Sequence, residues 1–376
     1  MYIALFVIII FFWMYTPNHA FLSSRNIVNL IDQTGYIAVL AVGMTLVIVI
    51  RHIDLSVGFL AGFLGAIAAI ALTAWNLPVL AVIPLVLVCG IAAGLFTGFL
   101  VAQMKIPSFV ATLAGWLGYR GALQLATFKT GTIIIPDDTF NALGTGFIPD
   151  MPSFGILPEV HKVTLLIGII AIVAFIFTSV NERKNKQAYN FEVLSMPIFV
   201  LKLIFISSII VIVTWILAGY NGLSWTAAIV LIVTLIYHFI TTQTVLGRHI
   251  YAVGGNPEAA ELSGINVKRL TYIVFGSMGL LTALSGILYA ARLKAATTTA
   301  GNLFELDAIA ATYVGGVSAA GGVGKVVGSI IGALVMMSLN SGMALMNIDI
   351  SYQYIVRAAV LAAAVIFDVV TRNSGK

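Results

Sequence analysis

The sequence predicts an all-α polytopic membrane protein with about 12 transmembrane helices (10–12) and with its N- and C-termini in the cytoplasm. Of the 376 residues, 60% are hydrophobic and only 9% are charged, whereas a soluble domain carries about 25% charged residues. The long apolar runs lack the strict alternation of barrel strands, which favours helices of about 20 residues each. No stretch offers a separate soluble domain, so residues 1–376 are expected to form a single transmembrane domain.

The apolar runs predict the spans in order along the chain. Met1–Tyr15 lacks the charged leader and the cleavage site of a signal peptide, so it is interpreted as a first span followed by an aqueous stretch at 16–32. Eleven more spans are expected near residues 33–50, 54–74, 78–103, 107–127, 162–181, 197–219, 223–241, 270–291, 304–320, 325–345 and 352–370. The polar stretch 128–161, with four prolines, is predicted to be an extracytoplasmic loop.

The basic residues predict the orientation, because cytoplasmic segments carry an excess of Lys and Arg. With the N-terminus inside, 12 of the 19 basic residues fall in cytoplasmic segments, and the run 181–186 is the strongest single indication. The polar stretch 242–269 is then a cytoplasmic loop. The single cysteine, Cys89, lies in an apolar run, so the sequence has no disulfide framework.

The loop at 242–269 contains its own helix signals. Asn256 suits an N-cap, Pro257 suits the first helical position, and Glu258 favours the positive end of the helix dipole. Gly264 is placed to end this short helix. Two interpretations follow: a surface helix that simply closes the loop, or a rigid helix that receives force from a soluble partner.

Three stretches far apart in the sequence carry the pattern of one known family. The first reads Gly-Arg-x-Ile-Tyr-Ala-x-Gly-Gly-Asn-Pro-Glu-Ala-Ala-x-x-Ser-Gly-Ile-Asn-Val at 247–267. The second joins 43–48 to 53–58, and the third joins 305–311 to the glycine-rich stretch that follows it. Together they resemble the permease subunits of sugar ABC importers, in the ribose/xylose/galactose (multiple-sugar) permease family. An additional pair of spans within 162–219 resembles the xylose-type branch.

This resemblance implies a multi-pass permease of the cell (inner, cytoplasmic) membrane that works with other proteins. ATP and Mg²⁺ would bind a separate ABC ATP-binding subunit, so this chain is expected to hold no cofactor and to be no enzyme. An extracytoplasmic sugar-binding protein would deliver xylose or a related pentose or hexose, and a second copy would complete a homodimer in the lipid bilayer; no nucleic-acid partner is expected. The resemblance places the ATPase-coupling residues at Gly254, Gly255, Asn256, Pro257, Glu258, Ala259, Ala260, Ser263 and Gly264.

A polar interruption between two apolar runs is the candidate for the translocation path. Polar side chains at membrane depth cost about 2.5–3.5 kcal/mol each on insertion and usually face a cavity or a partner. In one interpretation Asp54 and Ser56 begin a helix that lines the path, with Gly58 and the distant Asp307 as further path residues. In the other, Asp54 only caps the next span near the water interface. The glycines at 58, 62 and 65 have a spacing that allows close helix packing.

The glycine-rich stretch 315–325 ends in Gly-Lys and therefore invites comparison with a nucleotide-binding P-loop. Such a loop needs Gly where Ala319 stands and Ser or Thr where Val326 stands. Both positions fail, so a glycine-rich bend between two spans is favoured. If transport is driven by ATP, the ATPase must be another polypeptide.

An ion-coupled secondary transporter of a small solute is the alternative function. It needs an ion site near the membrane midplane, built from ionisable groups and broken helices, for which Asp54 and Asp307 are available. Glu305, Asp307 and Arg357 are compatible with a buried ion pair, a proton site or interfacial caps, and capping is favoured for Glu305. No spacing typical of a metal site or of nucleophilic catalysis appears in the sequence. The capped helix at 257–263 would be unexplained in such a transporter.

Overall fold

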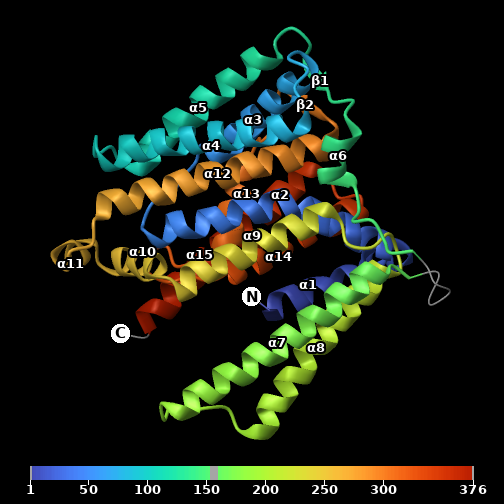
Figure 1. Cartoon of the computed structure of the whole chain (residues 1–376), viewed down its shortest axis with the longest axis vertical. Coiled ribbons are helices and arrows are strands. Elements are labelled where there is room, and N and C mark those ends of the chain that lie inside the picture. Colours follow the sequence, from blue (N-terminus) through green and yellow to red (C-terminus); the bar gives the residue numbers. More distant parts are fainter. Residues whose placement is uncertain (1, 153–159, 375–376) are drawn as a thin grey trace. The chain divides into compact units, whose positions relative to one another are not determined.

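The computed structural model describes residues 2–152 and 160–374, which are mostly helical. The chain divides into two compact units. The core unit consists of Met1–Gly146 and Trp225–Lys376, and the hairpin unit consists of Phe147–Ser224. Figure 1 colours the hairpin unit in green to yellow-green.

The first part of the core unit contains α1 (Tyr2–Tyr15), the 3-10 helix η1 (Pro17–Leu22), α2 (Ser24–Val49), α3 (Val57–Thr73), α4 (Val79–Ala102), α5 (Ser108–Thr127), β1 (Thr132–Ile134) and α6 (Asp138–Thr145). The second part contains α9 (Trp225–Gln243), α10 (Val245–Gly255), α11 (Pro257–Leu262), α12 (Val267–Leu293), β2 (Ala295–Thr297), α13 (Phe304–Val314), α14 (Val326–Leu345) and α15 (Ile350–Ser374). In Figure 1, α10 and α11 lie at one end of α2 and α12, and the antiparallel pair β1–β2 lies at the other.

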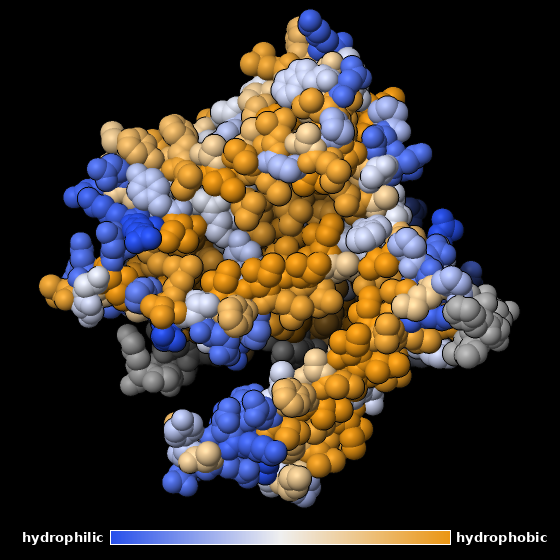
Figure 2. Space-filling view, viewed as in Figure 1, coloured by the Kyte–Doolittle hydropathy of each residue, from blue (hydrophilic) through white to orange (hydrophobic). Residues whose placement is uncertain are grey.

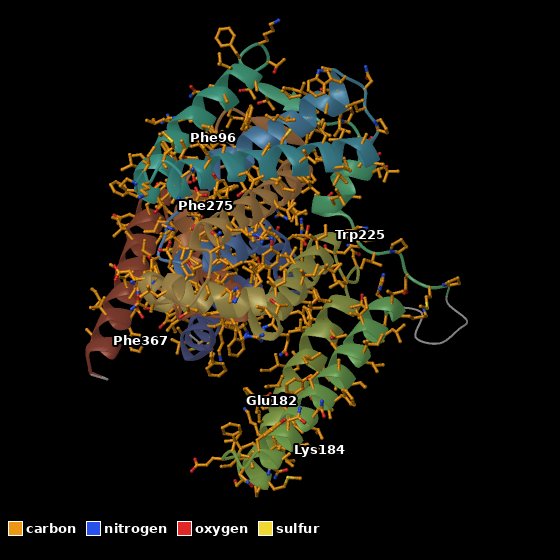
Figure 3. All side chains as sticks on the ribbon, turned by 60° about the vertical axis from the view of Figure 1, so that its left-hand side comes forward. Phe96, Glu182, Lys184, Trp225, Phe275 and Phe367 are labelled. Carbon is orange, nitrogen blue, oxygen red and sulfur yellow. The ribbon has the colours of Figure 1, made fainter. Side chains whose placement is uncertain are left out.

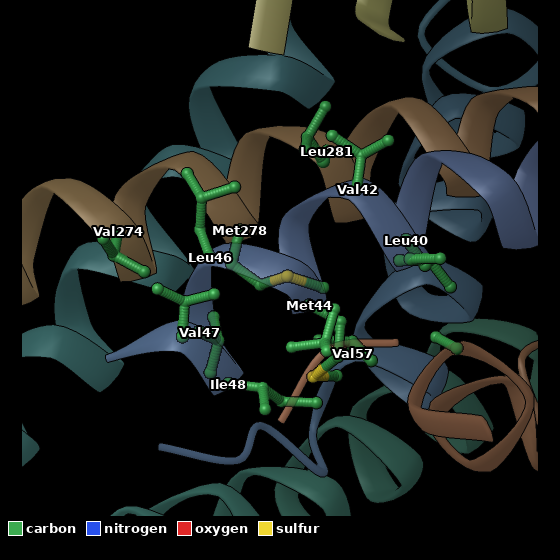
Figure 4. Close-up of a cluster of buried hydrophobic side chains, with 14 of the residues drawn as sticks. Leu40, Val42, Met44, Leu46, Val47, Ile48, Val57, Val274, Met278 and Leu281 are labelled. Atoms are coloured by element: carbon green, nitrogen blue, oxygen red, sulfur yellow. The ribbon is translucent and has the colours of Figure 1, made fainter. Parts of the chain in front are cut away.

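α2 and α12 form the centre of the core unit. Every residue of α2 from Ile37 to Val49 is buried. Met278 and Leu281 of α12 pack over Gly43 of α2, and Figure 4 shows the apolar side chains of the two helices packed together. The aqueous stretch expected at 16–32 is therefore too long, because α2 already begins at Ser24.

Glycines bring α4 and α12 into backbone contact. A Cβ atom added to Gly90 would overlap the carbonyl oxygen of Gly279, and one added to Gly279 would overlap the carbonyl oxygen of Gly90. Small residues allow this approach, which supplies the packing that drives helix association in a membrane.

Two long helices are each followed by an extended segment and a short helix. α2 leads through residues 50–56 to α3, and α12 leads through residues 294–303 to α13. The starts of the two short helices touch, because a Cβ atom added to Gly58 would overlap a carboxylate oxygen of Glu305. α13 has 11 residues and is about 17 Å long. It is too short for the full span expected at 304–320.

The hairpin unit pairs α7 (Lys162–Ala188) with α8 (Met196–Ala218). Gly168 of α7 packs against the side chain of Thr214 in α8. The segment that enters the unit pairs with the segment that leaves it. Ile148 N–H donates to Leu223 O at 2.9 Å, and Phe147 and Ser224 form an antiparallel bridge. Figure 2 shows apolar side chains along the visible face of this unit, with polar ones at its tip, where Figure 3 places Glu182 and Lys184.

Among the described residues, eight helices are long and apolar enough to cross a membrane, and two shorter apolar helices accompany them. This confirms a helical polytopic membrane protein. The count of 12 spans and the cytoplasmic termini stay predictions. Part of the predicted loop 128–161 lies outside the described residues, and β1 and α6 occupy the part before residue 146.

Candidate functional site

The short helix α11 forms where its local signals predict. The Asn256 side chain accepts a hydrogen bond from Ala259 N–H at 3.1 Å, which caps the helix start. Pro257 and Glu258 occupy its first turn. Gly264 follows the C-cap residue and has a φ of 86°, in the left-handed region that favours glycine. The predicted helix boundaries are therefore confirmed to within one residue.

A second helix, α10, precedes α11 and was not predicted. Its start carries a readable signal, because the Thr244 side chain accepts a hydrogen bond from Gly247 N–H at 3.2 Å. α10 is half-buried against the core unit, with Ile250, Val253 and Gly254 all buried. It joins the exposed α11 to the membrane-spanning helices.

Gly254, at the end of α10, packs directly on the C-terminal end of α2. A Cβ atom added to Gly254 would overlap the carbonyl oxygen of Val49. That same carbonyl oxygen accepts a hydrogen bond from Gly322 N–H at 2.9 Å. Three segments far apart in the sequence thus meet through their backbones, and each lies within or directly beside one of the three stretches on which the family resemblance rests.

Arg51 binds the end of α10. Its Nε donates to Gly254 O at 2.7 Å, and its Nη2 donates to Gly255 O. A cation at a helix C-terminus is favourable, because the last carbonyl groups carry partial negative charge. Arg51 has a φ of 66°, a left-handed conformation that costs an ordinary residue about 1–2 kcal/mol. Its N–H and that of His52 bond back to Ile48 O and Val47 O, which closes the turn that ends α2.

The glycine-rich stretch 315–325, which lies between α13 and α14, completes this contact. Tyr251 of α10 donates its hydroxyl to Gly324 O at 2.7 Å. Ser318 and Ala319 both donate to the carboxylate of Asp368 in α15, at 3.1 Å and 3.2 Å. We define Arg51, Gly254 and Gly322 as the clasp, since these residues hold α10, α2 and the glycine-rich bend together.

One face of α11 is exposed on the surface of the described part of the chain. Glu258, Glu261 and Leu262 are exposed, and Leu262 is 91% exposed although it is a large apolar residue. Ala260 is buried and anchors the opposite face. Of the predicted coupling residues, Gly254 and Ala260 face inward, Pro257 is half-buried, and the others are exposed. Their contact with an ATPase stays a prediction.

Three of the predicted path residues gather at the start of α3. Asp54 is buried and accepts hydrogen bonds from Ser56 N–H at 2.9 Å and from the Ser56 hydroxyl at 2.6 Å. The carboxylate therefore closes a turn with Ser56 just before α3, but the N-cap residue of α3 is Ser56, so Asp54 is not the cap that the alternative interpretation expected. This turn lies inside the core unit, where Gly58 meets Gly301 and Glu305. Asp54 is therefore a buried turn residue that precedes α3.

Glu305 of α13 contacts both α3 and α5. Its Oε1 accepts a hydrogen bond from the Trp116 indole of α5 at 3.0 Å. Its Oε2 is buried and has no hydrogen-bond partner among the described residues. Glu305 lies in the first turn of α13, where the positive end of the helix dipole favours an acidic side chain.

Asp307 lies apart from the other path residues. Its Oδ1 is 3.6 Å from Arg357 Nη1, which makes the ion pair that was one of three interpretations of these residues. Both side chains line a cavity of the core unit. Participation of Asp54, Ser56, Gly58 and Asp307 in a translocation path stays a prediction.

Comparisons with known proteins agree with the family resemblance. The family described as "branched-chain amino acid transport system / permease component" matches residues 26–365. The chain is 38% identical to the xylose transport system permease protein XylH of Haemophilus influenzae over 100% of its length and 96% of the relative. It is 39% identical to XylH of Escherichia coli K12 over 99% of its length and 91% of the relative.

A more distant similarity extends to ribose permeases. The ribose import permease protein RbsC of Haemophilus influenzae is 35% identical over 98% of this chain and 91% of the relative. No solved structure matches the chain. Because the family covers residues 26–365 and the similarity to these permeases spans nearly the whole chain, the chain belongs to this family of transport-system permease components.

Proposed function

We propose that this chain is the membrane-spanning permease subunit of an ATP-driven importer for xylose or a related simple sugar. The observation that carries the proposal is the clasp behind α11, which ties an exposed, capped helix to the end of the central helix α2. The permeases to which the chain is similar are named for xylose and ribose transport. Their names support the substrate class.

In this proposal α11 is the coupling helix. A separate ATP-binding subunit holds Leu262 and the neighbouring exposed side chains on the cytoplasmic side. When two such subunits approach each other, α11 moves, and α10 transmits the movement through the clasp to residues 50–56. These residues lead to α3, whose start contacts α13. The outward-open and inward-open states of the permease then differ in the contacts of α11 and in those of α3. Coupling requires such a difference between the two states.

The other components follow from the same proposal. Two copies of the permease present two α11 helices to two ATPase subunits in the inner membrane. An extracytoplasmic binding protein delivers the sugar to the outer face, on which the loop 128–161 lies. ATP and Mg²⁺ bind only the ATPase, and this chain catalyses no reaction.

Sugar uptake into vesicles tests the proposal. The chain is reconstituted with its candidate ATPase and binding protein, and uptake of D-xylose is followed with and without internal ATP. We expect uptake that requires ATP and both partners. Uptake by this chain alone, abolished when the ion gradient is collapsed, would contradict it.

The ion-coupled alternative rests on one specific observation. The starts of two discontinuous helices, α3 and α13, meet at Glu305, whose Oε2 is buried without a partner among the described residues. Broken helices with such a group resemble the ion sites of secondary transporters. The reconstitution above separates the two functions, since only this alternative predicts uptake without ATP.

A further inference from the structure

An open cavity of about 670 Å³ enters the core unit at the end of α2 opposite to the clasp. Asn29 lines the cavity and Val49 touches the clasp, 20 residues further along α2. This separation is about 30 Å along a helix. If α11 is cytoplasmic, the cavity therefore opens on the extracytoplasmic side, where a delivered solute enters. Its volume is in the range of small-molecule sites, roughly 300–1,000 Å³.

Amide side chains dominate the polar lining of this cavity. The six amides come from α2, α14, α15 and the segment before α13: Asn26, Asn29, Gln33, Asn302, Asn340 and Gln353. On α2 they follow a helical spacing that continues to Tyr36, so one face of α2 is directed at the cavity. An amide offers both donors and acceptors, which matches a ligand with several hydroxyl groups.

Two buried polar groups in the cavity wall have unused hydrogen-bonding capacity. Asn340 is only 9% exposed, and its Oδ1 has no hydrogen-bond partner among the described residues. The Nε of Arg357 is likewise buried and unpartnered within the described part of the chain. Because both atoms are closed off from the open cavity, a bound hydroxyl group reaches them only after a change of side-chain rotamer, and neither atom gives up an existing hydrogen bond in that change.

The apolar part of the wall consists of aromatic rings and of aliphatic side chains such as Leu293, Leu303 and Met337. Tyr36, Tyr289 and Phe304 pack on one another with ring centroids 4.8–5.1 Å apart. Such rings can pack against the C–H face of a sugar ring while the amides bind its hydroxyl groups.

Asp307 and Arg357 form an ion pair, and Arg292, the third charged residue of the lining, donates to Asn29 Oδ1 at 2.6 Å. The lining thus has one net positive charge, and its amides rather than its charges favour a ligand with several hydroxyl groups.

We propose that this cavity is a binding site for a monosaccharide of the pentose class, which the permease itself contacts through Asn340, Asp307 and Arg357. The inference rests on the proposed function and names where the sugar binds during import. A branched-chain amino acid, the other solute class connected with the family, has only one amino and one carboxylate group and would leave most of the six amides unused.

Protection of an introduced thiol tests this site. The only native cysteine is Cys89, so Cys89→Ala gives a background without thiols. Ser341→Cys places a thiol in the cavity wall, and Ser351→Cys places one on the exposed start of α15 outside it. The purified full chain is treated with a small methanethiosulfonate reagent while D-xylose or L-leucine is titrated.

We expect D-xylose to slow modification of Ser341→Cys on the order of tenfold once its concentration is about ten times Kd. Modification of Ser351→Cys should not change. Protection by L-leucine but not by D-xylose, equal protection at both positions, or no reaction of Ser341→Cys with the reagent would each overturn the site.

Transport by the reconstituted importer provides the second measurement. Asn340→Leu should raise the KM for D-xylose by roughly 3–10-fold, the loss expected for a hydrogen bond, while ATPase activity stimulated by the binding protein is retained. Wild-type uptake without protection at Ser341→Cys would overturn the site and leave the proposed function standing. Protection of Ser341→Cys by D-xylose without ATP-dependent uptake would support the site and overturn the proposed function.

Discussion

The central helix α2 and the hairpin helix α8 show that a more apolar helix need not be a more buried one. α8 is the more apolar of the two, yet only 6% of its most apolar window is buried, against 83% for α2. Lipid tails are as apolar as a leucine side chain, so apolar residues alone do not draw helices together in a bilayer. α2 instead carries the small residues that permit close contact, whereas α8 presents Ile, Val, Leu and Phe outward.

Side-chain truncation should give the largest difference between the two units. Met278→Ala in α12 removes a side chain that is 1% exposed, whereas Ile212→Ala in α8 removes one that is 57% exposed. We expect a loss of about 2–5 kcal/mol for the first, from lost contacts and a cavity, and a much smaller loss for the second. Reversible unfolding in detergent measures both. Equal losses would contradict the comparison, because they would show that the Ile212 side chain is also packed in the folded protein.

Glycine substitutions sharpen the same comparison at a smaller scale. Gly279→Ala drives a methyl group into the backbone of α4, which cannot move away, and should cost about 1–3 kcal/mol. Gly168→Ala in α7 meets side-chain atoms of Thr214 rather than the backbone of α8, so a small shift of α7 relieves the contact and the loss should be smaller. Gly118→Ala is the control, because no atom lies within 4 Å of the added methyl group. The same unfolding assay applies, and a larger effect at Gly168 would contradict this ordering.

Deletion of the hairpin should have the smallest effect on the core unit. The variant removes residues 149–222 and joins Ile148 to Leu223, which already pair, through a two-residue Asn-Gly turn. We expect it to insert and to elute as one symmetric peak, since Trp225 N–H and Gly146 O remain hydrogen-bonded at the junction. Deletion of α4 is the matched control and should abolish folding. Aggregation of both variants would mean that the core unit depends on the hairpin.

Local signals explain which parts of the fold could be predicted from the sequence. The start and end of α11 depend on Asn256, Pro257 and Gly264, which act within one or two turns. Packing between distant segments could not be predicted in this way. The run 304–320 was expected to span the membrane, but α13 ends at Val314, where Gly315 meets the backbone of Gly328.

The burial and the hydrogen-bond partners of the polar residues could not be predicted from the sequence either. Asp54 was interpreted as a path residue or as a cap of the next span, whereas the fold makes it a buried residue whose carboxylate closes a turn with Ser56, the N-cap of α3. Arg51 was one of the 12 basic residues counted as cytoplasmic, and nothing in the sequence indicated its hydrogen bonds to α10. The spacing of Asn26, Asn29 and Gln33 was readable as one helix face, but the stretch 16–32 was interpreted as aqueous.

The most direct test of the account is the ratio of ATP hydrolysed to xylose imported in the Arg51→Gly importer. Glycine accepts the left-handed conformation of Arg51, so the turn that ends α2 should be retained while the two hydrogen bonds to α10 are lost. Lys105→Gly is the matched control, because Lys105 is also an exposed basic residue with a positive φ, 55°, after α4.

We predict that Arg51→Gly retains ATP hydrolysis but raises the ratio about tenfold, within the range of a coupling free energy of about 1–3 kcal/mol, while Lys105→Gly keeps the wild-type ratio. An unchanged ratio in Arg51→Gly would show that the clasp does not connect α11 to the membrane-spanning helices and would contradict the coupling role assigned to it.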